Sequence, residues 1–232
     1  MSSTMYGPAM ATLSDTGGTR PRTKAAAARP RRTQAERRAE SERRMLSAAA
    51  DLIAQQGFGA TTLEQIGTRA GYSRGLVNQR YGSKENMVKA LVGQMHANFY
   101  RQAFPDSLSA PKGLPAICEV VDIYMQTFYR AGSAMRAYYV LMAESLGVIQ
   151  EIRDTFVAAT GSFRARFEEQ LQHAKRAGEV SRDLHVPSAA TLILSLLTGV
   201  CFLWMISPES MDLRTLRRTA IKAVEHALKP SS

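Results

Sequence analysis

The segment from residue 61 to residue 91 constrains the fold of this chain more than any other feature. Thr62 and Gln65 have the T-x-x-Q spacing of a capping box, which predicts the start of a short helix. Gly71 can adopt the positive φ of a tight turn after that helix, and Ser73 is suited to cap a second one. Two short helices joined by such a turn are typical of a helix-turn-helix.

The second of these helices, expected at 74–81, carries side chains that suit DNA. In a major groove, Arg can pair with guanine, and Asn or Gln with adenine. Hydroxyl groups, a Lys ammonium and helix-terminal amides suit phosphates. We therefore expect DNA contacts from Thr61, Thr62, Tyr72, Ser73, Arg74, Gly75, Asn78, Gln79, Tyr81 and Lys84. The alternative is that these residues are only the exposed polar surface of a helical bundle.

The rest of the chain also has helical periodicity. A capping box of Thr33 and Glu36 opens a first helix, which Gly57 should end. Within the helix-turn-helix, Ala70 is small enough for the two helices to approach. Apolar spacing and caps predict further helices at 84–103, 114–130, 133–146, 148–177, 187–206 and 208–228. No stretch alternates with period two, so we expect an all-α fold, with a three-helix DNA-binding domain at 33–92 and a helical domain at 93–232.

Residues 1–32 are rich in Ser, Thr, Gly, Pro and Ala, which predicts a disordered segment. Its second half contains six basic residues and no acid: Arg20, Arg22, Lys24, Arg29, Arg31 and Arg32. This segment is either a flexible arm that contacts DNA or a solvated tail. The net charge of +10 favours a polyanionic partner.

Cysteine usage and the N-terminal composition predict a cytoplasmic protein. Cys118 and Cys201 lie in separate apolar segments, and the N-terminus has no apolar signal core. The uncharged run at 189–206 reaches the lower limit for a membrane span, which leaves a membrane-anchored interaction protein as an alternative. A helix that is apolar on all sides is also found in a core or an oligomer interface, and we expect no membrane partner.

Catalytic and metal chemistry have little support in the sequence. The histidines are dispersed without metal-ligand spacing: His96, His173, His185 and His226. Either cysteine could act as a nucleophile if folding brought a histidine close, but no phosphate loop or paired catalytic motif is present. We therefore expect no enzyme, no metal and no cofactor.

The middle of the chain has the side chains of a ligand pocket. Tyr and Met provide adaptable, largely apolar walls with a few polar anchors. The candidate pocket residues are Phe99, Tyr100, Tyr124, Phe128, Tyr138, Met142, Phe156 and Trp204. An ordinary hydrophobic core is the alternative. Charges nearby could hold a cation (Glu119, Asp122, Glu144) or an anion (Arg130, Arg136, Arg153), and the sequence does not choose between them.

Residues 48–91 resemble the DNA-binding domain of the tetracycline-repressor (TetR) family. Three motifs carry the resemblance: Gly-Phe-x-x-Thr-Thr at 57–62, Ile-x-x-x-Ala-Gly at 66–71 and Tyr-Gly-Ser-Lys at 81–84. One departure is Asn78, where the family commonly has a tyrosine that contacts phosphate. Asn78 could instead contact a base or make a shorter phosphate contact.

The resemblance implies a homodimeric transcription factor, most often a repressor, that binds a near-palindromic operator. It also implies that the C-terminal domain binds a small-molecule effector and dimerises. The last two helices, at 189–206 and 208–228, would pair with those of the partner as a four-helix bundle. The helix from Lys84 connects the two domains and could act as a lever. A transcriptional activator or a ligand-independent DNA binder remains an alternative.

Overall fold

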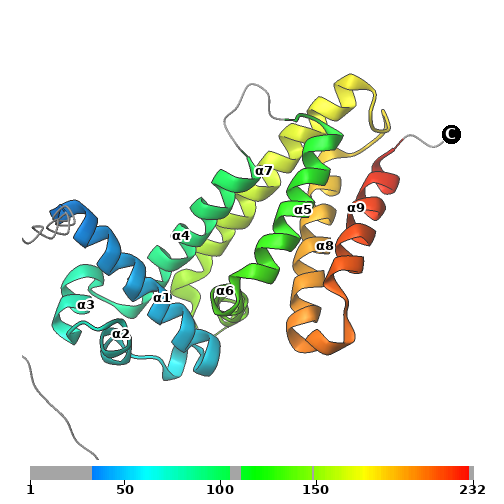
Figure 1. Cartoon of the computed structure of the whole chain (residues 1–232). Helices are drawn as coiled ribbons and strands as arrows, with labels where there is room; N and C mark the ends of the chain where they lie inside the picture. Colours follow the sequence, from blue (N-terminus) through cyan, green and yellow to red (C-terminus); the bar gives the residue numbers. More distant parts are fainter. Residues whose placement is uncertain (1–32, 105–110, 148, 230–232) are drawn as a thin grey trace, which may run out of the picture.

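The computed structural model describes residues 33–104, 111–147 and 149–229; the predicted arm at 1–32 lies outside them. Every regular element within these residues is a helix, which confirms the predicted all-α fold (Figure 1). The α-helices are α1 (Gln34–Ala60), α2 (Leu63–Ala70), α3 (Arg74–Tyr81), α4 (Lys84–Ala103), α5 (Leu114–Ala131), α6 (Ser133–Glu144), α7 (Arg153–Ala177), α8 (Val186–Ile206) and α9 (Leu213–Leu228). Two short 3-10 turns, η1 (Gln150–Ile152) and η2 (Pro208–Ser210), precede α7 and α9.

The helices at the N-terminal end all begin at caps that the sequence predicts. In each case the side-chain oxygen of the capping residue accepts a hydrogen bond from the backbone amide three residues later. The capping residues are Thr33, Thr62, Ser73 and Ser83. Local sequence is therefore enough to set where these helices start.

Two glycines give the helix-turn-helix its shape. Gly71 ends α2 in the left-handed region, with φ of 78° and ψ of 30°, as predicted. A further close approach, which the sequence did not predict, lies at Gly67, next to the turn that leads into α3. A Cβ atom on Gly67 would lie 2.9 Å from the backbone oxygen of Tyr72 and 3.3 Å from the amide nitrogen of Arg74.

The structure differs from the prediction at several helix boundaries, and three of them matter for the fold. Gly57 bends α1 instead of ending it, because the chain resumes a short helical turn that runs to Ala60. The last helix starts at Leu213 and not at residue 208, because the Asp212 carboxylate caps it by accepting from the amide of Arg214 at 3.0 Å. The long helix α7 starts at 153 rather than 148, after the turn η1.

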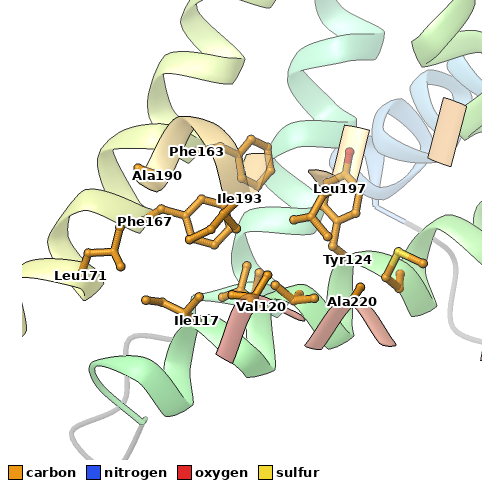
Figure 2. Packing of buried hydrophobic residues seen from close by; sticks show 14 of the residues in the cluster. Ile117, Val120, Tyr124, Phe163, Phe167, Leu171, Ala190, Ile193, Leu197 and Ala220 are labelled. Carbon is orange, nitrogen blue, oxygen red and sulfur yellow. The ribbon is translucent and has the colours of Figure 1, made fainter. Parts of the chain in front are cut away.

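Buried side chains form two hydrophobic cores. The first joins α1 to α4 and also includes Leu141 of α6 and Phe156 of α7, so it extends beyond residue 92. The second fills the bundle of α5, α7, α8 and α9 together with the end of α4. Figure 2 shows side chains of α5, α7 and α8 meeting in this bundle, among them Ile117, Val120, Tyr124, Phe163, Phe167, Leu171, Ile193 and Leu197.

Candidate DNA-binding surface and ligand cavity

The helix α3 presents one polar face to solvent. Val77 is completely buried and holds α3 against the first core. The exposed residues on and beside the outer face are Ser73, Arg74, Gly75, Leu76, Asn78 and Gln79, with Tyr72 half-buried at its edge. Sequence reasoning missed Leu76, which is 41% exposed and has the apolar character to contact a thymine methyl group.

Arg74 is available to a partner. Its Nη1 lies 3.8 Å from Oε2 of Glu64, and both side chains are largely exposed. A long, solvated pair of this kind contributes little free energy. The guanidinium of Arg74 can therefore exchange Glu64 for a base or a phosphate at small cost.

Arg80 fixes the orientation of α3. Its Nη1 donates to the backbone oxygen of Arg38 at 3.1 Å and to Oγ of Ser41 at 2.9 Å, both in α1. These hydrogen bonds join residues about 40 positions apart, so no local sequence motif predicts them. They hold the polar face of α3 in a defined direction relative to α1.

Thr61 and Tyr81, both predicted to contact DNA, point into the protein. Thr61 is fully buried, and its Oγ1 donates to the backbone oxygen of Gly57 at 2.7 Å. The hydroxyl of Tyr81 is buried without a hydrogen-bond partner among the described residues. Burial raises the pKa of Tyr81 to about 12. In this conformation neither hydroxyl reaches the surface that DNA can contact.

The Lys84 ammonium, which we predicted to point at DNA, instead donates hydrogen bonds to backbone oxygens of the protein. Its Nζ donates to the backbone oxygens of Phe58 at 2.6 Å and Thr61 at 2.7 Å. It also lies 4.0 Å from the centre of the Phe58 ring. Burial lowers the pKa of Lys84. Its role here is to tie the start of α4 to the end of α1.

A cavity lies between α4, α5, α6, α7 and α8. The space between its lining residues is about 490 Å³, a figure that includes space open to solvent. The lining residues are Met95, His96, Phe99, Tyr124, Met135, Tyr138, Met142, Thr160, Phe163, Leu194 and Thr198. None of them is Asp, Glu, Lys or Arg, so the walls favour an uncharged ligand.

The structure brings half of the predicted pocket residues together. Phe99, Tyr124, Tyr138 and Met142 line the cavity. The other candidates are part of the surrounding packing and do not line it. Tyr100 donates its hydroxyl to the backbone oxygen of Ser162, Phe128 packs edge-on against Trp204, and Phe156 packs against Tyr138 from the first core.

The pocket prediction missed three polar residues of the lining, Thr160, Thr198 and His96, and His96 is the one that can titrate. Its ring stands edge-on to Phe163, with the ring centres 4.9 Å apart. Burial lowers the pKa of His96, and a backbone hydrogen bond at Ala159 opposes the shift. Its Nε2 is buried without a hydrogen-bond partner among the described residues. The cavity therefore has a neutral imidazole with one unused nitrogen in an otherwise largely apolar wall.

A wider groove adjoins the cavity along α6, α7 and α8. It encloses about 1620 Å³, much of it open to solvent. The groove and the cavity share Met142, Thr160, Leu194 and Thr198 in their linings. A ligand could therefore pass from the groove to the cavity by displacing these side chains.

One side of α8 is apolar and uncovered. Leu192, Leu196, Leu203 and Ile206 are between 37% and 69% exposed, and their spacing places them on one side of the helix. The opposite side, which includes Ile193 and Leu197, is buried in the second core. By length and composition alone, α8 is the one helix of the described residues that could cross a membrane.

Two family models match the chain, together over more than half of its length. Residues 45–91 match the model described as bacterial regulatory proteins of the tetR family. Residues 141–229 match the C-terminal region of MAATS-type transcriptional repressors. The first match contains the helix-turn-helix, and the second contains the end of α6 and all of α7 to α9.

Individual regulators align with this chain over most of its length. The HTH-type transcriptional regulator SrpR of Pseudomonas putida is 24% identical over 172 residues, which cover 74% of this chain and 78% of SrpR. The HTH-type transcriptional repressor BepR of Brucella suis biovar 1 is 22% identical over 86% of this chain and 96% of BepR. Among solved structures, a SmeT–triclosan complex superposes with a TM-score of 0.71 at 22% identity, covering 83% of this chain and 93% of SmeT. SmeT is the repressor of a Stenotrophomonas maltophilia multidrug efflux pump.

Proposed function

We propose that this chain, which belongs to the tetR family of bacterial regulatory proteins, is a homodimeric repressor that a small, uncharged ligand releases from a palindromic operator. The observation that carries the proposal is the outer face of α3. Its exposed Arg74, Asn78 and Gln79 can pair with base edges, while Arg80 and Val77 hold the helix in place. Such a protein acts in the cytoplasm, where the DNA is.

The uncovered side of α8 supports a dimer. A stripe of large apolar side chains exposed on a monomer is a common mark of an interface. Two copies facing each other through α8 and α9 would cover Leu192, Leu203 and Ile206. A membrane-spanning α8 would instead have to withdraw Ile193 and Leu197 from the second core, which opposes the membrane-anchored alternative.

The cavity supports an uncharged, largely apolar effector. Its walls carry no formal charge, and three methionines allow them to adapt to ligands of different shape. SmeT, which shares this fold, forms a complex with triclosan. A ligand in the cavity would favour a dimer geometry in which the two recognition helices no longer match groove positions about 34 Å apart.

The test of this function is selection of bound sequences from random duplex DNA by the full-length protein. A recovered palindrome with half-sites about one helical turn apart, or a multiple of it, would support a dimeric, sequence-specific regulator. Binding without a preferred sequence and with a steep salt dependence would contradict the proposal. The recovered operator would then serve to screen uncharged compounds for release.

Arg74 offers the sharpest single-residue test on that operator. Arg74→Ala should weaken binding by roughly 1–3 kcal/mol and relax the preference at one base pair of each half-site. Arg176→Ala, which removes the same charge from an exposed site in the last turn of α7, is the matched control. Equal losses in both variants would mean that Arg74 contributes only general charge.

A further inference from the structure

The helix α6 connects the ligand cavity with the DNA-binding end. It packs along α1, and Figure 1 shows it end-on between the N-terminal helices and the bundle. Met135, Tyr138 and Met142 project from α6 into the cavity lining. A ligand that pushes these side chains aside therefore acts on a helix that touches both halves of the molecule.

The C-terminal end of α6 is attached to the bend in α1. The Glu144 carboxylate accepts from the backbone amide of Phe58, with Oε2 at 3.2 Å and Oε1 at 3.4 Å. The bend itself depends on Gly57, which has a φ of 77°. A Cβ atom on Gly57 would lie 3.0 Å from Oε1 of Glu144, so this site suits glycine in both backbone conformation and space.

The same turn is held from a second direction. Lys84 of α4 donates to the backbone oxygens of Phe58 and Thr61. Directly after Thr61 comes Thr62, whose side chain caps α2. The turn at 57–61 is thus held by a carboxylate through its amide and by an ammonium through its carbonyls, and it leads straight into the helix-turn-helix.

The N-terminal end of α6 has its own attachment. Oγ of Ser133 donates to Oδ1 of Asp51 in α1 at 2.5 Å. Oδ2 of Asp51 lies 3.6 Å from Nε of Arg69 in α2. These groups are more exposed than the amide of Phe58, so water competes for them more than it does for the bond at Glu144.

We propose that Glu144 is a positioning residue for operator binding: its carboxylate sets the turn before α2 according to where α6 lies. The proposal rests on the proposed function, in which ligand binding weakens operator binding. The hydrogen bond between Glu144 and the Phe58 amide would transmit that effect from the cavity to the helix-turn-helix. Hydrogen bonds weaken steeply once they lengthen or bend, so a shift of α6 by roughly 1 Å is enough to release the Phe58 amide. The turn, α2 and α3 are then free to leave the operator-binding geometry.

The test compares Glu144→Ala with Glu119→Gln, which removes the same charge from an exposed position on α5. Each protein is titrated with the operator recovered by selection and with a scrambled duplex of equal length. Loss of one charge-assisted hydrogen bond should weaken operator binding roughly tenfold. Binding to the scrambled duplex should match that of Glu119→Gln, because it depends on surface charge and not on the spacing of the recognition helices.

A second measurement follows the bond itself. Hydrogen exchange of the peptide covering 57–62, measured by mass spectrometry, should be faster in Glu144→Ala than in wild type and Glu119→Gln. Glu144→Gln, which keeps an acceptor oxygen without the charge, should fall between them in both assays.

Three outcomes decide the matter. Unchanged operator binding in Glu144→Ala, despite a clear wild-type preference for the operator, would overturn this inference and leave the proposed function standing. Equal losses on operator and scrambled DNA would reduce Glu144 to a role in folding, and would also overturn it. A wild-type protein without any sequence preference would overturn the proposed function, and this inference with it.

Discussion

The helices at the DNA-binding end and the helices around the cavity begin in different ways. Each of α1 to α4 starts with a Ser or Thr side chain that caps its first turn. None of α5 to α8 has a side-chain cap of this kind. The amides at the start of α5 are instead satisfied from α7 and just beyond it: Gly113 donates to Gln170 at 3.0 Å, and Leu114 donates to Glu179 at 2.8 Å.

The difference suits the function that we propose for each half. The surface of α3 must keep one shape to match base edges, and local caps with short turns give it that shape independently of the rest. The cavity walls have to change shape around a ligand, and helices that are placed by packing can shift together. If so, damage to packing should affect mainly the bundle, and damage to local geometry mainly DNA binding.

The largest expected effect is loss of packing in the bundle. Phe167 of α7 is 1% exposed and lies at the centre of the second core. Phe167→Ala should lower the free energy of unfolding by roughly 3–5 kcal/mol, because it removes buried area and leaves a cavity. Urea denaturation measures the loss, with Val157→Ala on the same helix as control, because Val157 is 59% exposed. A loss below about 1 kcal/mol would mean that the bundle collapses around the gap and is softer than its packing indicates.

Gly67→Ala tests local geometry in the opposite half. The new Cβ would lie 2.9 Å from the backbone oxygen of Tyr72, and a backbone atom cannot move aside as a flexible side chain can. We expect a cost of roughly 1–3 kcal/mol and a clear loss of operator affinity, because α2 and α3 are forced apart. Gly59→Ala is the control, since a Cβ there meets nothing within 4 Å. Operator binding that survives Gly67→Ala would contradict a rigid helix-turn-helix.

The difference between local caps and long-range packing also explains which features the sequence could predict. Caps such as Thr62 and turns such as Gly71 depend on residues within a few positions of each other, so their pattern is visible in the chain. The bond between Glu144 and the Phe58 amide joins residues 86 positions apart, and no spacing rule reaches that far. The sequence indicates Glu144 only as one of several acidic residues that could hold a cationic ligand.

The cavity was predictable in kind but not in detail. Helical spacing identifies Phe99 and Phe128 equally well as inward-facing aromatics, yet only Phe99 lines the cavity. The way the helices cross decides whether an inward-facing side chain lines the cavity or packs against another side chain. Helix crossing is a feature of the tertiary structure, so the spacing of residues in the sequence does not predict it. His96 was not predicted to line the cavity, because an isolated histidine on a helix forms no sequence pattern.

A smaller effect compares caps across the two halves. Thr62→Ala removes the side-chain oxygen that accepts from the amide of Gln65 and should cost about 1 kcal/mol. Thr191→Ala, early in α8, removes a hydroxyl that bonds only to the carbonyl of Pro187 one turn back, and the expected cost is a few tenths of a kcal/mol at most. Thermal unfolding of both variants measures the contrast. Equal losses would mean that the N-terminal caps are no more important than other helical hydroxyls.

The smallest expected effect is the pH dependence that His96 gives to the cavity half. Burial lowers its pKa below the ordinary value of 6.5. The unfolded chain therefore takes up a proton at a higher pH than the folded protein does. The stability that comes from a neutral His96 is complete above pH 6.5 and is lost as the pH falls from there towards the folded pKa.

Replacing His96 by Leu isolates this contribution. Urea denaturation of wild type and His96→Leu at several values between pH 7.5 and pH 5 should show wild type losing more stability than the variant as the pH falls. The difference should be modest, because the ring is only half-buried and water screens part of the charge. Parallel pH profiles would mean that water reaches the imidazole freely. The cavity would then be more open than the edge-on contact between His96 and Phe163 indicates, and its preference for uncharged ligands correspondingly weaker.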